Sequence, residues 1–469
     1  MIDRREILDA ATRVSLSPHV VEKDYVLGWV LAGIYAHEDV RDAWLFRGGT
    51  CLKKCFFETY RFSEDLDFTL RDAGHIGEHF LQTAFGEIGA WIYEEAGIEI
   101  PAEKQDFDIF VNPRGNLVCQ GKLSYAGPIS PRTGGWPRIK LDLTAVERVV
   151  LPPVRVPIFH PYSDAPADSI EVLAYDYIEA FAEKFRALAE RTRPRDLYDV
   201  VNLYRNTEAR PDATAFRNVL KEKCEFKGIA VPQLADLMAH RIDVEAGWKQ
   251  MLDHQLPALL PVDSFWDELP AIFDWLHGAA APPRLAPFPI AGTLVRERIF
   301  ETPGVLGSQS FIETIRFAAA NRLRIDLQYR DLKGAISTRT VEPYSFRRSA
   351  AGDVRLMATQ EADGEPRSFL LDGILGVSVT QRTFVPRYLV ELTPAGSMSI
   401  PQSFSNAMPR ALRRPMRRIV STGPTYIFRC SACGKQFSRK THDSSLRPHK
   451  NKSGWACYGR HGIYVRLKY

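Results

Sequence analysis

The chain has 469 residues, of which 45% are hydrophobic and 25% are charged. These fractions are typical of a globular protein and exclude a disordered or fibrous one, and the length predicts two to four domains. No apolar run approaches the ~18–20 residues that span a bilayer. The start, MIDRREILDA, lacks the apolar core of an export signal. We therefore expect no membrane segment and a cytoplasmic location.

The net charge is only +4, but it is unevenly distributed. From Ser405 to Tyr469 there are 15 lysines and arginines against one acidic residue, Asp443, a local balance of +14. The rest of the chain is acidic, with 46 basic and 56 acidic residues. A basic tail on an acidic body predicts an anionic partner, and the alternative is a tail that only aids solubility.

Changes in composition predict five segments. Residues 1–278 mix helical patterns with short alternating strands, and 279–292 belong to a linker rich in Ala, Pro and Gly. Residues 293–400 open on the helical segment SFIETIRFAAANR and continue as alternating strands. Residues 401–420 form a basic connector, and 421–469 form a small Cys/His module. The fold class is multidomain α/β.

A double glycine marks the first candidate site. AWLF before Gly48 is typical of a short buried strand, and TCLKKCFFETY after Gly49 has helical spacing. A strand, glycines and a helix start bring free backbone N–H groups together, which suits a phosphate. Thr50 can cap the helix or bind a phosphate oxygen. We therefore predict nucleotide binding at Gly48, Gly49 and Thr50.

Three carboxylates follow on alternating segments. In EDLDFTL, Asp65 and Asp67 face the same way, about 6.5–7 Å apart along a strand. RIKLDLT repeats the pattern, and a neighbouring strand would bring Asp142 beside them. Three such carboxylates can hold two Mg²⁺ or Mn²⁺ ions for displacement at phosphorus. The alternative is a solvated acidic strand edge.

The order of these motifs resembles a known family. GGTxLxK, RFSEDLDF, VEKDYVL, IKLDLT and EAFAEKFRALAERTRPRDLYDV together are similar to AbiEii/AbiGii-type toxins of type IV toxin–antitoxin systems, within the nucleotidyltransferase superfamily. The similarity covers roughly residues 15–275. It implies a polymerase-β-like mixed sheet with helices and transfer of a nucleoside monophosphate from an NTP. It also implies an RNA acceptor, usually the 3′ end of tRNA, a role as toxin or phage-defence effector, and a separate antitoxin.

The same resemblance implies further site residues. Lys184 and Asp196 match the family's active-site lysine and aspartate, with Asp196 orienting Lys184 or the acceptor. Lys53 is implied in nucleotide binding, and Glu22 and Lys23 brace the site. Lys184 lies beside a helical apolar stripe of Ile178, Phe181, Phe185 and Leu188. A surface salt-bridge network between two helices is the alternative.

Residues 310–390 resemble a WYL domain, a small Sm-like β-barrel. The matching pieces are FIETIRFAAANRLRIDLQYRD, STRTVEPYSF and EPRSFLLDGILGVSV. The resemblance implies a nucleotide- or nucleic-acid-binding pocket lined by Tyr329, Arg339, Arg347 and Arg367. Many WYL domains have Asp-Arg-Ile where this chain has Asp-Gly-Ile at 372–374. A scaffolding barrel is the alternative.

The tail contains a predicted zinc ribbon. Cys430 and Cys433 have the spacing of a metal knuckle, and Cys457 adds a third thiolate. We favour His449 as the fourth ligand, with His461 and His442 as alternatives. A structural Zn²⁺ would replace the core that so short a segment lacks, and iron is the alternative metal. Cationic residues are interleaved with the aromatic residues Phe437, Trp455 and Tyr458. This pattern suits binding of RNA or single-stranded DNA. The alternative is a zinc module that only packs on the WYL barrel.

The sequence thus predicts a Mg²⁺-dependent nucleotidyltransferase that modifies RNA, at a tRNA 3′ end, with appended WYL and zinc-ribbon modules. Two alternatives remain at this point. WYL domains and zinc ribbons also occur in regulators, so the chain could be a nucleic-acid-binding sensor with an inactive enzyme domain. It could also nucleotidylate a protein.

Overall fold

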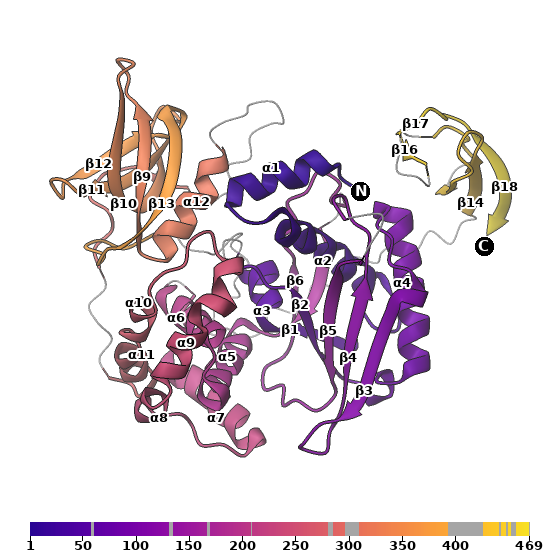
Figure 1. The fold of residues 1–469 in the computed structure, drawn as a ribbon, viewed down its shortest axis with the longest axis horizontal. Helices are drawn as coiled ribbons and strands as arrows, with labels where there is room; N and C mark the ends of the chain where they lie inside the picture. The colour runs from indigo at the N-terminus through magenta and orange to yellow at the C-terminus, as the bar shows by residue number, and fades with distance from the viewer. Residues whose placement is uncertain are drawn as a thin grey trace, which may run out of the picture. The chain divides into compact units, whose positions relative to one another are not determined.

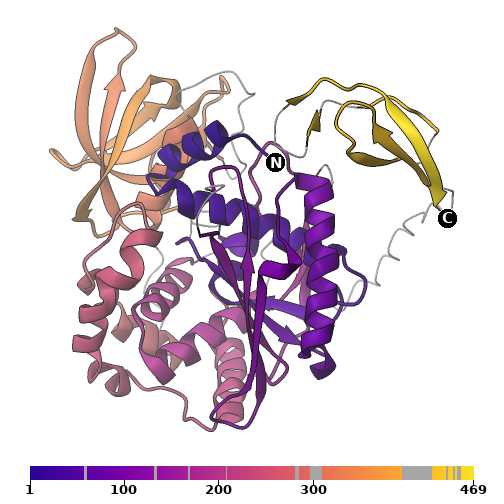
Figure 2. The same ribbon diagram turned by 45° about the vertical axis from the view of Figure 1, so that its right-hand side comes forward.

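The computed structural model describes residues 1–57, 61–130, 135–166, 169–207, 209–279, 285–295, 309–392, 425–439, 442–446, 449–451 and 456–468. The chain forms two compact units, Met1–Ser403 and Phe404–Tyr469. Figure 1 and Figure 2 show the ribbon from two directions. The predicted basic connector at 401–420 lies outside the described residues.

The first unit is built on a seven-stranded mixed sheet with the order β3-β4-β5-β2-β1-β7-β6. β2 runs parallel to β5 and β1 parallel to β7, and the other neighbours are antiparallel. The mixed sheet with helices that the sequence predicts is confirmed. The strands are β1 (Trp44–Arg47), β2 (Asp65–Leu70), β3 (Gln105–Val111), β4 (Leu117–Ser124), β5 (Arg138–Thr144), β6 (Val154–Pro157) and β7 (Glu171–Ala174).

A buried helix supports this sheet. Every residue of α2 from Asp24 to Ile34 is buried, as expected of a helix that is apolar on nearly all sides. It packs against α1, α4 and β7, and α4 packs against β3. The helical elements here are α1 (Arg4–Val14), α2 (Pro18–Ala36), α3 (Gly48–Cys51), the π-helical η1 (Leu52–Phe56), η2 (Ala73–His75), α4 (Glu78–Ala96) and η3 (Ala102–Lys104).

A helical part follows the sheet. α5 begins after Asp176, whose carboxylate accepts a hydrogen bond from the Ile178 N–H, and ends at Thr192 with left-handed backbone. Pro194 then starts α6, where a missing N–H costs no hydrogen bond. The predicted apolar stripe on α5 is buried. The elements are α5 (Tyr177–Arg191), α6 (Pro194–Arg205), α7 (Ala213–Lys227), α8 (Leu234–Met238), α9 (Arg241–Leu252), η4 (Asp253–Gln255), α10 (Asp263–Trp266) and α11 (Leu269–Leu276).

An antiparallel sheet forms the rest of the first unit. Its strand order is β12-β11-β10-β9-β13, with β8 on β10. Within the described residues β12 and β13 stay unpaired edges, so the sheet is open and not the closed barrel that we expected. The elements are β8 (Thr293–Leu294), α12 (Gln309–Ala320), β9 (Leu323–Arg330), β10 (Ile336–Arg348), β11 (Val354–Gln360), β12 (Pro366–Leu370), η5 (Leu371–Gly373) and β13 (Ile374–Thr383).

The second unit is small. It contains a three-stranded sheet ordered β15-β14-β18 and a two-stranded pair of β16 with β17. The strands are β14 (Thr425–Cys430), β15 (Gln436–Arg439), β16 (His449–Lys450), β17 (Ala456–Cys457) and β18 (Gly462–Lys468). Among the described residues of the whole chain, no helix is both long enough and apolar enough to cross a membrane.

Candidate active site

Asp67 and Asp142 lie side by side in the sheet of the first unit. β2 and β5 are parallel neighbours, and their register pairs Asp67 with Asp142 and Asp65 with Lys140. Gly48 follows β1 directly beside them. A Cβ on Gly48 would lie 2.0 Å from Oδ2 of Asp67, and its φ is +81°. Only glycine meets both requirements, which explains the first glycine of the pair.

Both central carboxyls have raised pKa values. Burial raises the pKa of Asp67 to about 6. The Asp142 carboxylate also raises this pKa, whereas the Arg47 guanidinium lowers it. Burial and the charge of Asp65 raise the pKa of Asp142. Burial and mutual repulsion disfavour the ionised forms of these carboxyls, so a bound cation would stabilise them. Hard oxygen donors of this kind prefer Mg²⁺ or Mn²⁺. These residues therefore fit a divalent-cation site.

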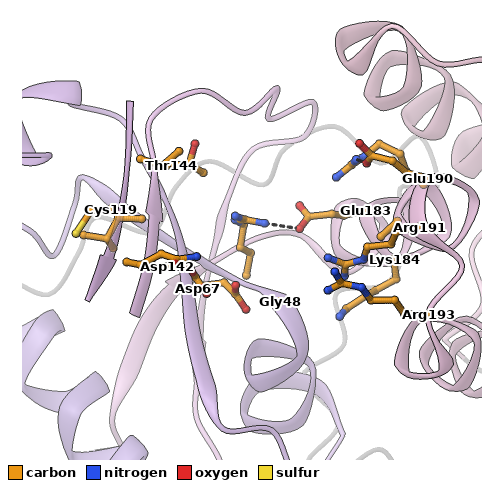
Figure 3. A pocket seen from close by; sticks show the side chains of 16 residues that line it. Gly48, Asp67, Cys119, Asp142, Thr144, Glu183, Lys184, Glu190, Arg191 and Arg193 are labelled. Atoms are coloured by element: carbon orange, nitrogen blue, oxygen red, sulfur yellow. Dashed lines mark hydrogen bonds and ion pairs between the residues drawn. The ribbon is translucent and has the colours of Figure 1, made fainter. Parts of the chain in front are cut away.

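A cavity of about 430 Å³ opens at these carboxylates. Strands β4 and β5 line one side, and α5 with the turn after it lines the other. Figure 3 shows Asp67 and Asp142 on the sheet side and Lys184, Arg191 and Arg193 across from them. Two carboxylates thus face a wall, called here the cationic wall, whose four cations outnumber its two carboxylates; these residues are Lys184, Arg186, Arg191 and Arg193 against Glu183 and Glu190. This arrangement suits a polyphosphate with a bound cation, since each side of the cavity neutralises one part of the complex.

Asp199, and not the predicted Asp196, holds Lys184. Nζ of Lys184 lies 2.8 Å from Oδ2 of Asp199, and Arg61 donates to both oxygens of Asp199 at 2.7 and 2.8 Å. Burial would raise the pKa of Asp199, but Arg61 and Lys184 hold it well below its usual range. Asp196 instead accepts hydrogen bonds from Arg191 at 2.7 and 2.9 Å. Both aspartates thus position cations of the same wall.

A buried chain of ions that the sequence analysis missed fixes Arg47. Arg47 and Glu183 both line the cavity and lie 2.6 Å apart. Lys223 lies 3.6 Å from Glu183 and 2.5 Å from Glu179. Burial opposes ionisation of Glu183, but Arg47 and Lys223 lower its pKa. Their positions in the sequence could have indicated a role at the site, because Arg47 directly precedes the glycine pair and Glu183 directly precedes Lys184.

The other predicted nucleotide-binding side chains point into the protein. Thr50 is buried, and its hydroxyl donates to the backbone oxygen of Asp65 at 2.5 Å. Lys53 is buried with its ammonium 4.0 Å from the centre of the Phe62 ring. Among the described residues that line the cavity, only Gly48 comes from this predicted group. Thr50 ties the turn to β2, so its role is to position the site.

Three polar residues of α2, among them Glu22 and Lys23, contact the segments around the glycine turn. Lys54, which is the lysine at the GGTxLxK spacing, is buried and bonds Asp24 of α2 at 2.8 Å. Glu22 accepts hydrogen bonds from two backbone N–H groups after β4 at 2.6 and 2.9 Å. Lys23 lies 2.6 Å from Glu64, the residue before Asp65 in the sequence. These contacts connect α2 to η1, to the loop after β4 and to the start of β2.

The comparison with protein families identifies this arrangement. The model of the family described as "Nucleotidyl transferase AbiEii toxin, Type IV TA system" matches residues 29–276. This chain belongs to the AbiEii nucleotidyltransferase family. The matched range of the AbiEii protein contains the carboxylates, the glycine turn and the cationic wall, so the enzyme class predicted from the sequence is confirmed. A second model, described as "WYL domain", matches residues 310–379.

No curated protein matches the AbiEii chain. A similar solved structure is "Proteasome accessory factor B/C (PafBC) of Arthrobacter aurescens", with 17% sequence identity and a TM-score of 0.17. The alignment covers 19% of this chain and 13% of that one. The likeness is therefore restricted to a small part of both proteins.

Two of the four predicted WYL pocket residues share one cluster. The Tyr329 ring lies 5.2 Å from the Phe369 ring, and the Arg339 guanidinium lies 5.8 Å from that same ring. Gly373 is the middle residue of the Asp-Gly-Ile triplet at 372–374. A Cβ there would lie 2.6 Å from the Tyr329 ring and 2.8 Å from the backbone oxygen of Arg330. The glycine is therefore the residue that this packing of Tyr329 requires.

The other two arginines are neutralised by carboxylates. Arg347 lies 2.6 Å from Glu391 and donates to the backbone oxygen of Gly292 at 3.1 Å. Arg367 lies 2.7 Å from Asp363, four residues before it on the chain. The structure thus separates the Tyr329–Arg339 cluster from two arginines that are engaged in local ion pairs.

The structure brings together four potential metal ligands in the second unit. The ligand atoms of Cys430, Cys433, His449 and Cys457 all lie within 4.8 Å of one another. The Cys430 and Cys457 sulfurs are 3.7 Å apart, and sulfurs around tetrahedral zinc lie about 3.8 Å apart. Burial opposes ionisation of Cys430, but backbone N–H groups of the knuckle lower its pKa to about 6. The cluster is compatible with a zinc ribbon.

Proposed function

We propose that this AbiEii protein transfers a nucleoside monophosphate from an NTP to an RNA acceptor, the 3′ end of a tRNA. A tRNA blocked at this end cannot be aminoacylated, which would make the enzyme a toxin or a phage-defence effector. The observation that supports the chemistry best is the placement of Asp67 and Asp142 across one cavity from Lys184, Arg191 and Arg193. The cytoplasm, which holds NTPs and tRNA, is the expected location.

Each residue has a defined task in this proposal. Asp65, Asp67 and Asp142 would hold Mg²⁺, which when bound lowers the pKa of the attacking hydroxyl and neutralises phosphate charge. Lys184, Arg191 and Arg193 would bind the β- and γ-phosphates. The acceptor oxygen forms a bond to the α-phosphorus while the α–β bridging bond breaks. Pyrophosphate leaves, and the hydroxyl proton passes to water.

The remaining parts of the proposal concern the modules. We place the transferase at 1–278, the linker at 279–292, the WYL-like domain at 293–400, the basic connector at 401–420 and the ribbon at 421–469. Cys430, Cys433, His449 and Cys457 would hold Zn²⁺. As a type IV toxin–antitoxin family member, the protein would be restrained by a separate antitoxin protein.

Transfer is tested with the full chain, Mg²⁺, total tRNA and each labelled NTP in turn. Wild type should label tRNA with a preferred nucleotide, and Asp67→Ala should reduce the rate by about 10³-fold because the cation site loses a central ligand. Asp106→Asn is the matched control. Asp106 lies on β3 of the same sheet, is exposed, pairs with Lys122 and does not line the cavity, so its variant should keep full activity.

The alternatives have distinct outcomes in the same assay. Label that appears on protein and disappears in Asp67→Ala would replace the RNA acceptor by a protein. Absence of label with every NTP, in folded and zinc-loaded protein, would overturn the transferase proposal. In that case specific DNA retention that Asp67→Ala leaves intact would establish the regulator.

A further inference from the structure

Four aromatic side chains gather on β14, β18 and the loop before Leu446. Phe428 is buried at the centre. Around it lie His442, with ring centres 5.5 Å apart, and Tyr464, at 5.8 Å. His442 also lies 5.1 Å from both Tyr426 and Tyr464. The buried Phe428 ring thus packs against His442 and Tyr464, and Tyr426 packs against these two outer rings.

The outer rings of this cluster lie outside the hydrophobic core of the ribbon. The buried core consists of Cys430, Leu446 and Cys457, with Cys433 and Phe437 packed against it. Tyr464 is 42% exposed, and His442 is also exposed. Rings that only filled a core would be covered, so their exposure needs another explanation.

The strands beneath the cluster are closely packed. A Cβ on Gly462 would lie 2.8 Å from Cβ of Phe428, so β18 approaches β14 closely at this point. Cys430, which belongs to the metal cluster, lies two residues after Phe428 on the same face of β14. Rings that are held in place before binding lose little conformational entropy when a ligand stacks on them.

The aromatic residues named in the sequence analysis lie elsewhere. The Phe437 ring packs 4.7 Å from the His449 ring, beside the metal cluster. Tyr458 is exposed and apart from the core. Trp455 lies outside the described residues. The outer rings that the structure brings together are instead Tyr426, His442 and Tyr464.

The surrounding charge points to a polyanion. Arg429, Arg460 and Arg466 are exposed in this unit. The single acidic residue between Ser405 and Tyr469, Asp443, accepts hydrogen bonds from the N–H and hydroxyl of Ser445 at 2.9 and 2.7 Å. The chain from Ser405 onward has a balance of +14. Exposed rings within a strongly basic segment suit a strand with accessible base faces and a phosphate backbone.

We propose that Tyr426, His442 and Tyr464 form a stacking surface for unpaired bases of single-stranded nucleic acid. Arg429, Arg460 and Arg466, which are exposed in the same unit, bind its phosphates. Duplexes are excluded from the aromatic surface, because their base faces are already stacked on each other. This binding does not depend on nucleotide transfer, so it would hold even if the catalytic proposal failed.

The test measures binding of fluorescein-labelled RNA of about 12 nucleotides, single-stranded or as a duplex, by fluorescence anisotropy. All variants are made in the full chain with Asp67→Ala, which prevents transfer. Tyr464→Ala should raise the Kd for the single strand by about tenfold, as expected for loss of one stacked base. Tyr464→Trp should keep tight binding, and Tyr464→Leu should not. A single-stranded DNA of the same sequence tests the role of the ribose hydroxyls.

Ile463→Ala is the matched control. Ile463 precedes Tyr464 on β18, is 63% exposed and belongs to the other face of the strand, so its variant should bind within about twofold of the parent. Zinc content is measured for every variant to show that the ribbon is folded. Unchanged single-strand binding by zinc-loaded Tyr464→Ala would overturn the proposal. An equal loss for single strand and duplex would overturn it too.

Discussion

The transferase region and the ribbon position their functional side chains in different ways. Around the carboxylates, Phe46, Leu66, Phe68 and Leu141 are fully buried parts of one large core. In the described part of the ribbon, Cys430, Leu446 and Cys457 form one small buried cluster. Two of those three residues belong to the group of potential metal ligands. In the transferase an apolar core supports a polar site, whereas in the ribbon two of the potential metal ligands are themselves core residues.

The two regions should therefore be destabilised by different changes. The transferase site adds buried ion pairs to its apolar support, as at Asp199 with Lys184 and Arg61. Removing one partner of such a pair leaves an uncompensated charge inside the protein. The ribbon has little buried apolar surface, so we expect its folding to be coupled to binding of a metal ion at the Cys/His cluster.

Metal removal should give the largest effect. Structural zinc sites contribute about 10–16 kcal/mol of apparent binding free energy, so a strong chelator should unfold the ribbon while the first unit stays folded. Hydrogen exchange measures this directly. Amides of β14 and β18 should lose protection, and amides of β2 and β5 should keep it. Retained protection of β14 after complete zinc removal would show that the ribbon folds without the metal.

Removal of a buried carboxylate should rank second. Asp199→Asn should lower the free energy of unfolding by about 3–5 kcal/mol, because Lys184 and Arg61 would lose their shared partner. Urea denaturation measures this loss. The matched control is Asp196→Asn, which should cost only about 1 kcal/mol because its partner Arg191 is 46% exposed. Equal costs for the two variants would show that burial of the partner does not matter here.

Two leucine truncations should give smaller and contrasting effects. Leu66→Ala, in the fully buried centre of β2, should cost about 2–5 kcal/mol in the unfolding of the first unit. Leu446→Ala should leave that transition unchanged and instead weaken zinc affinity by about tenfold, since folding of the ribbon is coupled to metal binding. Competition with a colorimetric zinc chelator measures this. Unaltered zinc affinity would separate Leu446 from the metal-coupled core.

Much of the transferase site follows from short-range patterns. The alternation in EDLDFTL and RIKLDLT predicts the strands and puts Asp67 and Asp142 on shared faces, because side chains alternate with a period of two. Their pairing in neighbouring parallel strands agrees with this prediction. The spacing of Cys430 and Cys433 predicts a knuckle for a similar reason, since the loop between them is short.

Other features depend on distances between segments far apart in the chain. Asp196 and Asp199 lie three residues apart on α6, so spacing alone cannot say which meets Lys184. Thr50 and Lys53 belong to a glycine-turn motif, yet their side chains point inward because the helix after the turn is buried. The WYL-like sheet leaves its two edge strands unpaired in the described residues, which local alternation does not predict.

Local patterns were enough to predict the helices and strands, the faces of β2 and β5 and the types of ligand, because these depend on neighbours within a few residues. Only the tertiary structure decided which cations meet which carboxylates and that Arg47 joins the site. It alone also brought Tyr426, His442 and Tyr464 together beside the buried Phe428. Those choices depend on the packing of distant segments, where differences of a few ångströms decide whether two side chains touch.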